Sequence, residues 1–417
     1  MKILYLSTLD IMGGAARGAY RLHRSLLDKG VDSTMLCCRK FSDDPTVQGP
    51  RNTWELRYWF FRHWATKQVL RMQRSDNPII HSINLLPTGT HRRVNAFDPD
   101  IVQMHWIGSE MINIAEVAQI KRPIVWRLAD QWAFSGAEHY AMSGQDERFT
   151  AGYRQDNRPE GYAGLDIDRW TWSRKMKHWQ DKPMTIITGS KWLAECARRS
   201  VLFKNKRVEA VPSGIDVSIY KPLGREQARE ILNLPQNKKL ILFGALSATS
   251  DPRKGFHLLS PALQQVAKAM PGNTEALVLG SSQPVNAPDF GMPVHYIPKL
   301  SDDWSLALVY SAADVLVAPS TMDNLPFSVM EAQACGTPCV AFDIGGMPDM
   351  IEHDRNGWLA TPFKTEELAE GILRPLGDDT LRKQWSKLGR QKAEAEYDVR
   401  IQAETYINIY NQILGKQ

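Results

Sequence analysis

The stretch from residue 314 to residue 346, DVLVAPSTMDNLPFSVMEAQACGTPCVAFDIGG, restricts the fold of this chain more than any other segment. It begins with the apolar run from Val315 to Ala318, which has the length of a buried parallel strand. A turn at Pro319 follows, and residues 327–335 then predict a helix that ends at Gly336. The segment therefore predicts a parallel strand whose following loop leads into the start of a helix.

Such a loop is suited to binding an anion. Backbone N–H groups and the positive end of the helix dipole gather at the start of a helix, and together they can hold a phosphate. Asp323 lies in the loop and Glu331 lies about two turns along the helix. Two carboxylates on either side of an anion site favour a ligand with sugar hydroxyls on both sides of a diphosphate, which is a nucleotide sugar.

These residues resemble the carboxylate-x7-Glu signature of retaining glycosyltransferase family 4, whose members have the GT-B fold. The resemblance implies that Glu331 holds the nucleotide ribose and that Asp323 holds the donor sugar. The first acid is Asp where the family usually has Glu, so its side chain is one methylene shorter. The implied diphosphate contacts come from the loop and the first helical residues, which are Asn324, Leu325, Pro326, Phe327 and Ser328.

Strand and helix predictions alternate along the whole chain in two successive halves. This pattern predicts an α/β protein with two facing, doubly wound parallel-sheet domains. The predicted strands span residues 2–7, 98–105, 123–128, 184–188, 239–246, 275–280 and 293–298, and helices are predicted over 15–29, 256–269 and 302–312. We expect an acceptor-binding domain over residues 1–216, a donor-binding domain over 217–396, and a terminal helix over 397–417 that crosses back to the first domain.

Two further loops are candidates for contacts with the donor. Gly13 and Gly14 lie between the first predicted strand and its helix, where family 4 enzymes carry a glycine loop that faces the donor. Lys254 follows a strand and precedes Gly255, and the resemblance implies that it neutralises the leaving diphosphate. The family's second cation normally follows the strand's glycine directly, but this chain has Ala245 there, so Arg253 is the candidate replacement.

The segment from 126 to 140 resembles a family 4 subgroup with His-Asp at a strand end, an aromatic loop and His-Tyr. This chain keeps Asp130 and His139, but Ala129 stands where the relatives have a histidine. An alanine cannot contact a sugar hydroxyl or transfer a proton. His105, Asp130 and His139 are therefore the candidates for the missing role, although each is also compatible with a structural position.

Composition limits the class of protein. At 417 residues with 43% hydrophobic content, the chain is long enough for two soluble domains. The five cysteines form an odd, scattered set without metal-ligand spacing, and the beginning of the chain is not a signal peptide, so a cytoplasmic protein is expected. The resemblance to GT-B enzymes implies a donor site without a metal, and no cofactor is expected. Residues 1–216 carry 32 Lys plus Arg against 23 Asp plus Glu. This basic half favours an anionic surface or substrate, and no nucleic-acid motif accompanies it.

A helix predicted over residues 54–74 combines aromatic and basic side chains. One apolar stripe contains Trp54, Tyr58, Phe61, Ala65, Val69 and Met72, and the far side carries Lys67, Arg71 and Arg74. Such a helix can bind an anionic membrane surface peripherally. A helix packed within the first domain, or one that lines an acceptor cleft, is the alternative.

The sequence thus predicts a retaining, metal-independent glycosyltransferase. It would move a hexose from a UDP or GDP sugar to a saccharide acceptor, with a polyprenyl-diphosphate-linked saccharide expected from family 4 enzymes that build bacterial surface polysaccharides. The expected location is the cytoplasm, with peripheral binding to the inner face of the membrane. A nucleotide-sugar epimerase of the same fold and a non-catalytic nucleotide-sugar-binding subunit are the alternatives.

Overall fold

The computed structural model describes residues 1–416 apart from 76, 142–147, 245–250 and 285–287. It divides into two compact units. Unit 1 consists of Met1–Pro212 together with Gln402–Gln417, and unit 2 consists of Ser213–Ile401. Ala245 and part of the predicted strand over 239–246 lie outside the described residues, as does part of the long loop that follows Tyr140.

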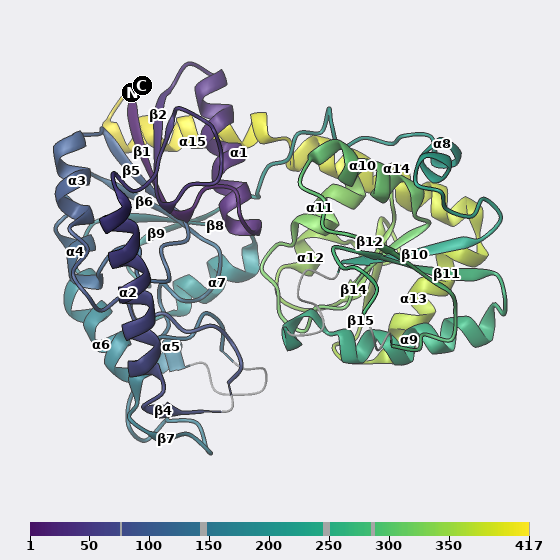
Figure 1. The fold of residues 1–417 in the computed structure, drawn as a ribbon, viewed down its shortest axis with the longest axis horizontal. Coiled ribbons are helices and arrows are strands. Elements are labelled where there is room, and N and C mark those ends of the chain that lie inside the picture. The colour runs from purple at the N-terminus through teal and green to yellow at the C-terminus, as the bar shows by residue number, and fades with distance from the viewer. Residues whose placement is uncertain (76, 142–147, 245–250, 285–287, 417) are drawn as a thin grey trace. The chain divides into compact units, whose positions relative to one another are not determined.

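Unit 1 is built on a parallel sheet with the strand order β3-β2-β1-β5-β6-β8-β9, and β4 and β7 form a separate antiparallel pair (Figure 1). Its strands are β1 (Lys2–Leu9), β2 (Asp32–Arg39), β3 (Val47–Gln48), β4 (Gln73–Arg74), β5 (Ile101–Met104), β6 (Ile124–Leu128), β7 (Ala163–Gly164), β8 (Met184–Thr188) and β9 (Arg207–Ala210). Its helices are α1 (Gly14–Asp28), α2 (Thr53–Leu70), α3 (Thr90–Phe97), α4 (Ile114–Ala118), α5 (Arg148–Ala151), α6 (Ile167–Trp179) and α7 (Lys191–Arg199).

Both faces of this sheet are covered. The helices α3, α4, α6 and α7 pack on one face. The other face is covered by α1 and by the last helix, α15 (Val399–Leu414). Within unit 1, the Tyr410 hydroxyl donates to Gln103 Oε1 at 2.9 Å, and Arg127 donates to the Tyr406 hydroxyl at 3.1 Å. These buried hydrogen bonds fix the end of the chain to the first unit.

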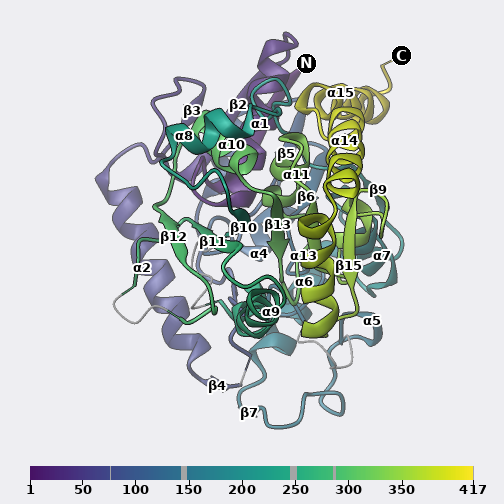
Figure 2. The ribbon, with the colours of Figure 1, turned by 90° about the vertical axis from the view of Figure 1, so that its right-hand side faces the viewer.

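Unit 2 has a parallel sheet with the strand order β12-β11-β10-β13-β14-β15, of which β12, β11, β10 and β13 are seen side by side in Figure 2. Its strands are β10 (Lys239–Gly244), β11 (Thr274–Leu279), β12 (Val294–Ile297), β13 (Val315–Ala318), β14 (Cys339–Phe342) and β15 (Gly357–Ala360). Its helices are α8 (Arg225–Ile231), η1 (Pro252–Lys254), α9 (Phe256–Ala269), α10 (Asp303–Ala312), α11 (Phe327–Ala334), α12 (Met347–Met350), α13 (Thr365–Gly377) and α14 (Asp379–Glu396).

The strand order of unit 2 determines where a ligand can bind. Strand β10 is the first of the unit, and its neighbours β11 and β13 lead the chain in opposite directions across the sheet. In open parallel sheets, ligands bind beyond the carboxyl ends of the strands at such a reversal point. The loops after β10 and β13 are therefore the expected walls of a site in unit 2.

Helix α2 differs from its sequence-based prediction. It spans Thr53–Leu70 and not 54–74, since Gln73–Arg74 pairs with β7 as strand β4. The face turned to the protein carries Trp59, Arg62 and Thr66. Trp59 Nε1 donates to the Ser109 carbonyl at 2.9 Å, and Arg62 donates to the Glu110 carbonyl at 3.1 Å. The stripe around Trp54 and Phe61 is consequently exposed.

Candidate active site

The two loops at the reversal point of unit 2 are joined by an ion pair. Lys254 ends η1 after β10, Asp323 follows β13, and Lys254 Nζ donates to Asp323 Oδ2 at 2.8 Å. The negative charge of Asp323 raises the pKa of Lys254 and outweighs the opposing effect of burial. Lys254 is therefore a firmly protonated cation at the carboxyl end of the sheet. Sequence reasoning placed both residues in the site but did not predict that they bind each other.

Backbone contacts hold these loops together independently of the ion pair. The Thr321 amide donates to the Arg253 carbonyl at 2.7 Å. Gly255 has φ of +66°, and a Cβ atom there would lie 1.8 Å from the Pro319 carbonyl oxygen. Behind Asp323, the Gly346 amide donates to its carbonyl at 3.1 Å. The loops thus approach one another as closely as backbone atoms allow, which gives Lys254 and Asp323 a defined separation.

Gly255→Ala should lower the melting temperature and displace the Lys254 loop, because the new methyl group meets backbone atoms that cannot rotate away. Gly272→Ala is the matched control, since Gly272 has the same φ of +66° but open space around its Cβ position. Both variants carry the cost of a left-handed alanine, about 1 kcal/mol or more. If calorimetry shows a larger loss of melting temperature in Gly255→Ala than in Gly272→Ala, the difference is due to the close approach of Gly255 to the Pro319 carbonyl. Equal losses would show that the loop contact is unimportant.

Arg253 forms an ion pair with Asp251. Its guanidinium binds Asp251, with NH2 at 2.7 Å from Oδ2 and Nε at 3.1 Å from Oδ1. This pair holds the Asp251 pKa below its ordinary value in spite of burial, which acts in the opposite direction. A second cation, Arg253, therefore lies next to Lys254 in the sequence, and it is paired with Asp251.

Helix α11 begins directly after the loop that carries Asp323. Pro326 is its N-cap and provides no side-chain hydrogen bond to the helix. The preceding residues Asn324 and Leu325 are buried, and Leu325 belongs to the hydrophobic core. The predicted donor residues Phe327 and Ser328 form the first turn of the helix. The helix start is thus fixed by core packing, and its positive dipole end faces the loop that carries Asp323, an arrangement that suits an anionic ligand.

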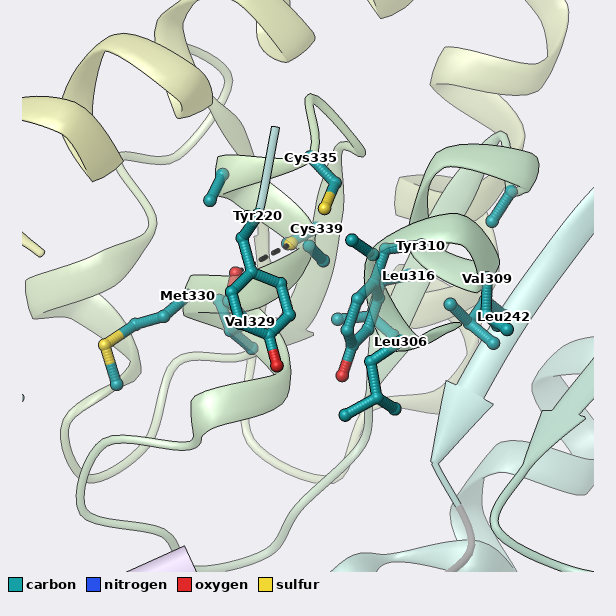
Figure 3. Packing of buried hydrophobic residues seen from close by; sticks show 14 of the residues in the cluster. Tyr220, Leu242, Leu306, Val309, Tyr310, Leu316, Val329, Met330, Cys335 and Cys339 are labelled. Atoms are coloured by element: carbon teal, nitrogen blue, oxygen red, sulfur yellow. Dashed lines mark hydrogen bonds between the residues drawn. The ribbon is translucent and has the colours of Figure 1, made fainter. Parts of the chain in front are cut away.

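Glu331 is buried one turn further along α11, and sequence reasoning missed its partner. The Tyr310 hydroxyl on α10 donates to Glu331 Oε2 at 3.0 Å. Figure 3 shows Tyr310 within the apolar cluster, beside Leu306 and Leu316. Burial and then the nearby Glu331 charge raise the pKa of Tyr310 well above its ordinary value, so it remains a donor. Tyr310 therefore orients the carboxylate predicted to hold a ribose.

The remaining predicted residues lie in unit 1. Gly13 precedes α1 with φ of +91°, a backbone conformation that favours glycine, and Gly14 is the first residue of the helix. His105 is buried and stacks on Tyr5 with ring centroids 5.1 Å apart, which fits a structural position. These residues belong to unit 1 and the Lys254–Asp323 pair belongs to unit 2, so the predicted site residues are divided between two units.

Asp130 and His139 do come together. His139 Nδ1 donates to Asp130 Oδ2 at 2.6 Å, and His139 Nε2 lies 2.9 Å from Ser82 Oγ. Burial raises the Asp130 pKa, but the His139 charge and hydrogen bonds from His139, Trp132 and Trp106 outweigh it and hold that pKa low. His139 is 1% exposed, so it has almost no surface of its own for a ligand. The sequence showed no signal for Ser82, which meets His139 only because the fold brings these two distant residues together.

Comparison with known protein families gives a match within unit 2. Residues 224–392 match the family model described as glycosyl transferases group 1, a match that covers about two fifths of the chain and lies wholly in unit 2. The matched segment contains the Lys254–Asp323 pair and Glu331.

Curated relatives match a similar part of the chain. The D-inositol 3-phosphate glycosyltransferase of Saccharomonospora viridis is 27% identical over 223 residues, which are 50% of this chain and 51% of the relative. The enzyme of that name from Segniliparus rotundus is 30% identical over 184 residues, 41% of this chain and 40% of the relative. The chain thus spans about half or less of the length of these relatives.

Solved structures resemble the chain over nearly its full length. A sucrose-phosphate synthase from Thermosynechococcus elongatus has a TM-score of 0.66 at 18% identity, with 99% of both chains covered. The fold is GT-B. WaaG, a glycosyltransferase involved in lipopolysaccharide biosynthesis, has a TM-score of 0.64 at 16% identity and covers 99% of this chain and 100% of its own. HepE of Anabaena, solved in complex with UDP-glucose, has a TM-score of 0.63 at 17% identity, with 99% of this chain and 100% of that chain covered. The GT-B prediction from the sequence is confirmed.

Proposed function

We propose that this protein is a glycosyltransferase that moves a hexose from a nucleotide diphosphate sugar to a hydroxyl of a saccharide acceptor. The observation that carries the proposal is the Lys254–Asp323 pair, which places a protonated ammonium at the reversal point of the sheet in unit 2. The start of α11 follows the loop that carries Asp323, and the buried Glu331 lies on the same helix. The match of this unit to glycosyl transferases group 1 supports the assignment.

The reaction we propose proceeds with retention and without a metal. The bond between the sugar's anomeric carbon and the leaving phosphate oxygen breaks, and the acceptor oxygen bonds to that carbon on the same face. The acceptor proton passes to the departing phosphate, so no enzyme nucleophile is required. Lys254 and the start of α11 stabilise the charge that develops on the diphosphate. This route tolerates Ala129 because no histidine needs to act as a base.

Asp323 has a role in donor selection under this proposal. In the free protein its carboxylate holds Lys254, and its Oδ2 also lies 3.4 Å from Ser320 Oγ. A donor that arrives must therefore offer a diphosphate to Lys254 and sugar hydroxyls to Asp323. The relatives solved with UDP or UDP-glucose favour a UDP sugar among the UDP and GDP donors considered.

A thermal-shift screen tests the donor assignment. A ligand that binds the folded state raises the melting temperature by mass action, by an amount that grows with its concentration over Kd. We expect one nucleotide sugar among UDP, GDP and ADP sugars to raise it most, and Lys254→Ala to reduce that shift. If no nucleotide sugar shifts the wild-type protein at millimolar concentration, the donor assignment fails.

We also propose that α2 attaches the protein to an anionic membrane, where a polyprenyl-diphosphate-linked saccharide is the acceptor. Trp54 is 74% exposed and Phe61 is 52% exposed, on a helix whose buried face lies elsewhere. Arg57 lies over the Trp54 ring at 5.2 Å and adds positive charge beside it. Within the described residues, no helix is long and apolar enough to cross a membrane.

Sedimentation with anionic liposomes should remove the wild-type protein from the supernatant at low salt, because aromatic rings enter the headgroup region and each nearby cation adds about 1 kcal/mol. Replacement of Trp54 and Phe61 by serine should abolish binding. Trp304→Ser is the control, since Trp304 is 54% exposed but belongs to unit 2. Wild-type protein that remains in the supernatant would exclude this role for α2.

A further inference from the structure

The sheet of unit 1 has a reversal point of its own. Strand β1 is the first strand of the chain, and it lies between β2 and β5, from which the strand order continues in opposite directions. The loop after β5 is fastened to β1, because the Thr8 amide donates to the Trp106 carbonyl at 2.9 Å and the Thr8 hydroxyl donates to the Gly108 carbonyl at 2.8 Å. In open parallel sheets, ligands bind beyond the strands at such a point.

The loop after β5 also contains a strained turn. Ser109 and Glu110 have φ of 51° and 65°, a left-handed conformation that costs free energy in residues other than glycine. Helix α2 supports this turn, since Trp59 donates to the Ser109 carbonyl and Arg62 donates to the Glu110 carbonyl. Strained backbone held in place by its surroundings is concentrated at binding and catalytic sites.

Trp106 stands at the start of this loop with its indole held in one orientation. Its Nε1 donates to Asp130 Oδ2 at 3.0 Å, and its ring lies beside the His139 ring, with centroids 5.3 Å apart and planes tilted by 34°. A Cβ atom at Gly108 would lie 2.8 Å from the indole, so the glycine makes room for it. Trp106 is nevertheless only half-buried, and part of its aromatic surface remains open to a ligand.

Asp130 lies beside this indole, two residues after β6, and keeps an acceptor position for a ligand. Its Oδ2 accepts from Trp106 and His139. Among the residues that the structure describes, the Trp132 amide is the one donor to its Oδ1, at 3.0 Å. A carboxylate oxygen can accept about two hydrogen bonds, so Oδ1 can accept one more. The Asp130 side chain is 13% exposed, which leaves access for a hydroxyl group.

Buried residues support Asp130 from behind. His139 Nδ1 donates to Asp130 at 2.6 Å, and its Nε2 lies 2.9 Å from Ser82 Oγ. Ser82 Oγ in turn accepts from the Ser109 amide at 3.1 Å. His139 and Ser82 are each 1% exposed. They are therefore positioning residues, which connect the strained turn to the carboxylate without contacting a ligand themselves.

We propose that Trp106 and Asp130 bind the acceptor saccharide, with one face of a sugar ring stacked on the indole and a hydroxyl of that ring donating to Asp130 Oδ1. The C–H groups on one face of a hexose carry partial positive charge, which suits the negative face of an aromatic ring. Small-molecule sites commonly combine aromatic surface with a few fixed polar groups. This site rests on the glycosyl transfer proposed above and adds Trp106 to the residues predicted from the sequence.

Saturation-transfer difference NMR of the full chain with the methyl glycosides of glucose, galactose and mannose tests the site without a donor. We expect the wild-type protein to saturate the ring protons of at least one glycoside, most strongly on the face that stacks on the indole. Trp106→Ala should lower the affinity for that glycoside about tenfold, and Trp106→Phe should retain part of it because an aromatic face remains.

Trp172→Ala is the matched control, since Trp172 is also half-buried in unit 1 but lies on α6 beside Tyr153. It should bind the glycoside as the wild-type protein does. Equal affinities of the wild-type and Trp106→Ala proteins would overturn the proposal. A wild-type protein that saturates none of the three glycosides would overturn it as well.

Asp130→Asn gives a second test that keeps the volume of the side chain. Loss of the charged acceptor should weaken glycoside binding about tenfold. A glycoside that lacks the hydroxyl bound by Asp130 should bind the wild-type and Asp130→Asn proteins equally. Ser82→Ala should weaken binding of the complete glycoside but have no further effect in an Asp130→Asn background, a dependence that a purely structural role would not produce. If every monodeoxy glycoside loses as much affinity as the complete one, Asp130 does not bind the sugar.

Transfer assays separate this site from the proposed function. Trp106→Ala should raise the KM for the acceptor and leave the KM for the nucleotide sugar unchanged. Sugar transfer with an acceptor KM that does not depend on Trp106 would remove this site alone. Glycoside binding that depends on Trp106, without transfer from any nucleotide sugar, would instead refute the proposed function.

Discussion

Lys254→Ala should lower turnover at saturating donor and acceptor by about 100-fold or more, as expected for the loss of a group that stabilises developing charge. The ammonium lies at the point where two loops meet beyond the sheet of unit 2, and its pKa is raised by Asp323. It is therefore charged when the diphosphate leaves. Turnover is measured as nucleotide release under conditions in which wild-type protein and variant are both saturated.

Two controls separate this role from a structural one. Lys254 is partly exposed, so the melting temperature of the Lys254→Ala protein should differ little from that of the wild type. Arg253→Ala should reduce turnover less, because the Arg253 guanidinium is bound by Asp251. Wild-type turnover in Lys254→Ala would remove this residue from the mechanism. A collapse of the melting temperature would show that the ion pair supports the fold.

Glu331→Ala should weaken free nucleotide and nucleotide sugar alike, by about 10- to 100-fold, because hydrogen bonds to a charged group contribute roughly 1.5–3 kcal/mol. Asp323→Ala should weaken only the sugar-bearing donor. It also releases Lys254 from its ion pair, so the affinity for free nucleoside diphosphate should stay equal or rise. Calorimetric titration of each variant with both ligands measures the difference. Equal losses for both ligands in both variants would show that the two roles are wrongly divided.

The buried contact with Tyr310 requires its own control in that experiment. Glu331→Ala leaves the Tyr310 hydroxyl without this acceptor in an apolar cluster, which costs roughly 1–3 kcal/mol of stability. Tyr310→Phe removes the hydroxyl and retains the ring. If Tyr310 orients Glu331, Tyr310→Phe should weaken nucleotide binding in the presence of Glu331 and have no further effect in a Glu331→Ala background.

The elements of unit 2 were largely predictable from local patterns. The helix predicted over 256–269 is α9 with the same bounds, and the apolar run after Asp314 is strand β13. Buried parallel strands are continuous apolar runs, and Gly255 marks the start of α9 through its backbone conformation. These signals are contained within a few neighbouring residues, so one sequence is sufficient to read them.

The contacts between distant segments were not predictable in this way. Helix α2 buries Trp59 and Arg62, which donate to the carbonyl groups of residues 109 and 110, whereas hydrophobic periodicity alone indicated the stripe at Trp54. Likewise, the Tyr310–Glu331 and Ser82–His139 contacts join residues on different elements. Hydrophobic periodicity describes one element at a time. It therefore carries no information about a polar partner that lies on another element.

The central claim is that this protein transfers a sugar from a nucleotide diphosphate donor. Its most direct measurement is an incubation with the nucleotide sugar that binds most tightly and with phosphate-linked saccharide acceptors, followed by analysis of nucleotide and product. We predict stoichiometric release of nucleoside diphosphate and a glycosylated acceptor whose new linkage keeps the donor's anomeric configuration. An altered sugar without transfer would indicate an epimerase. Tight donor binding with no chemical change for any acceptor would contradict the claim and leave a binding protein.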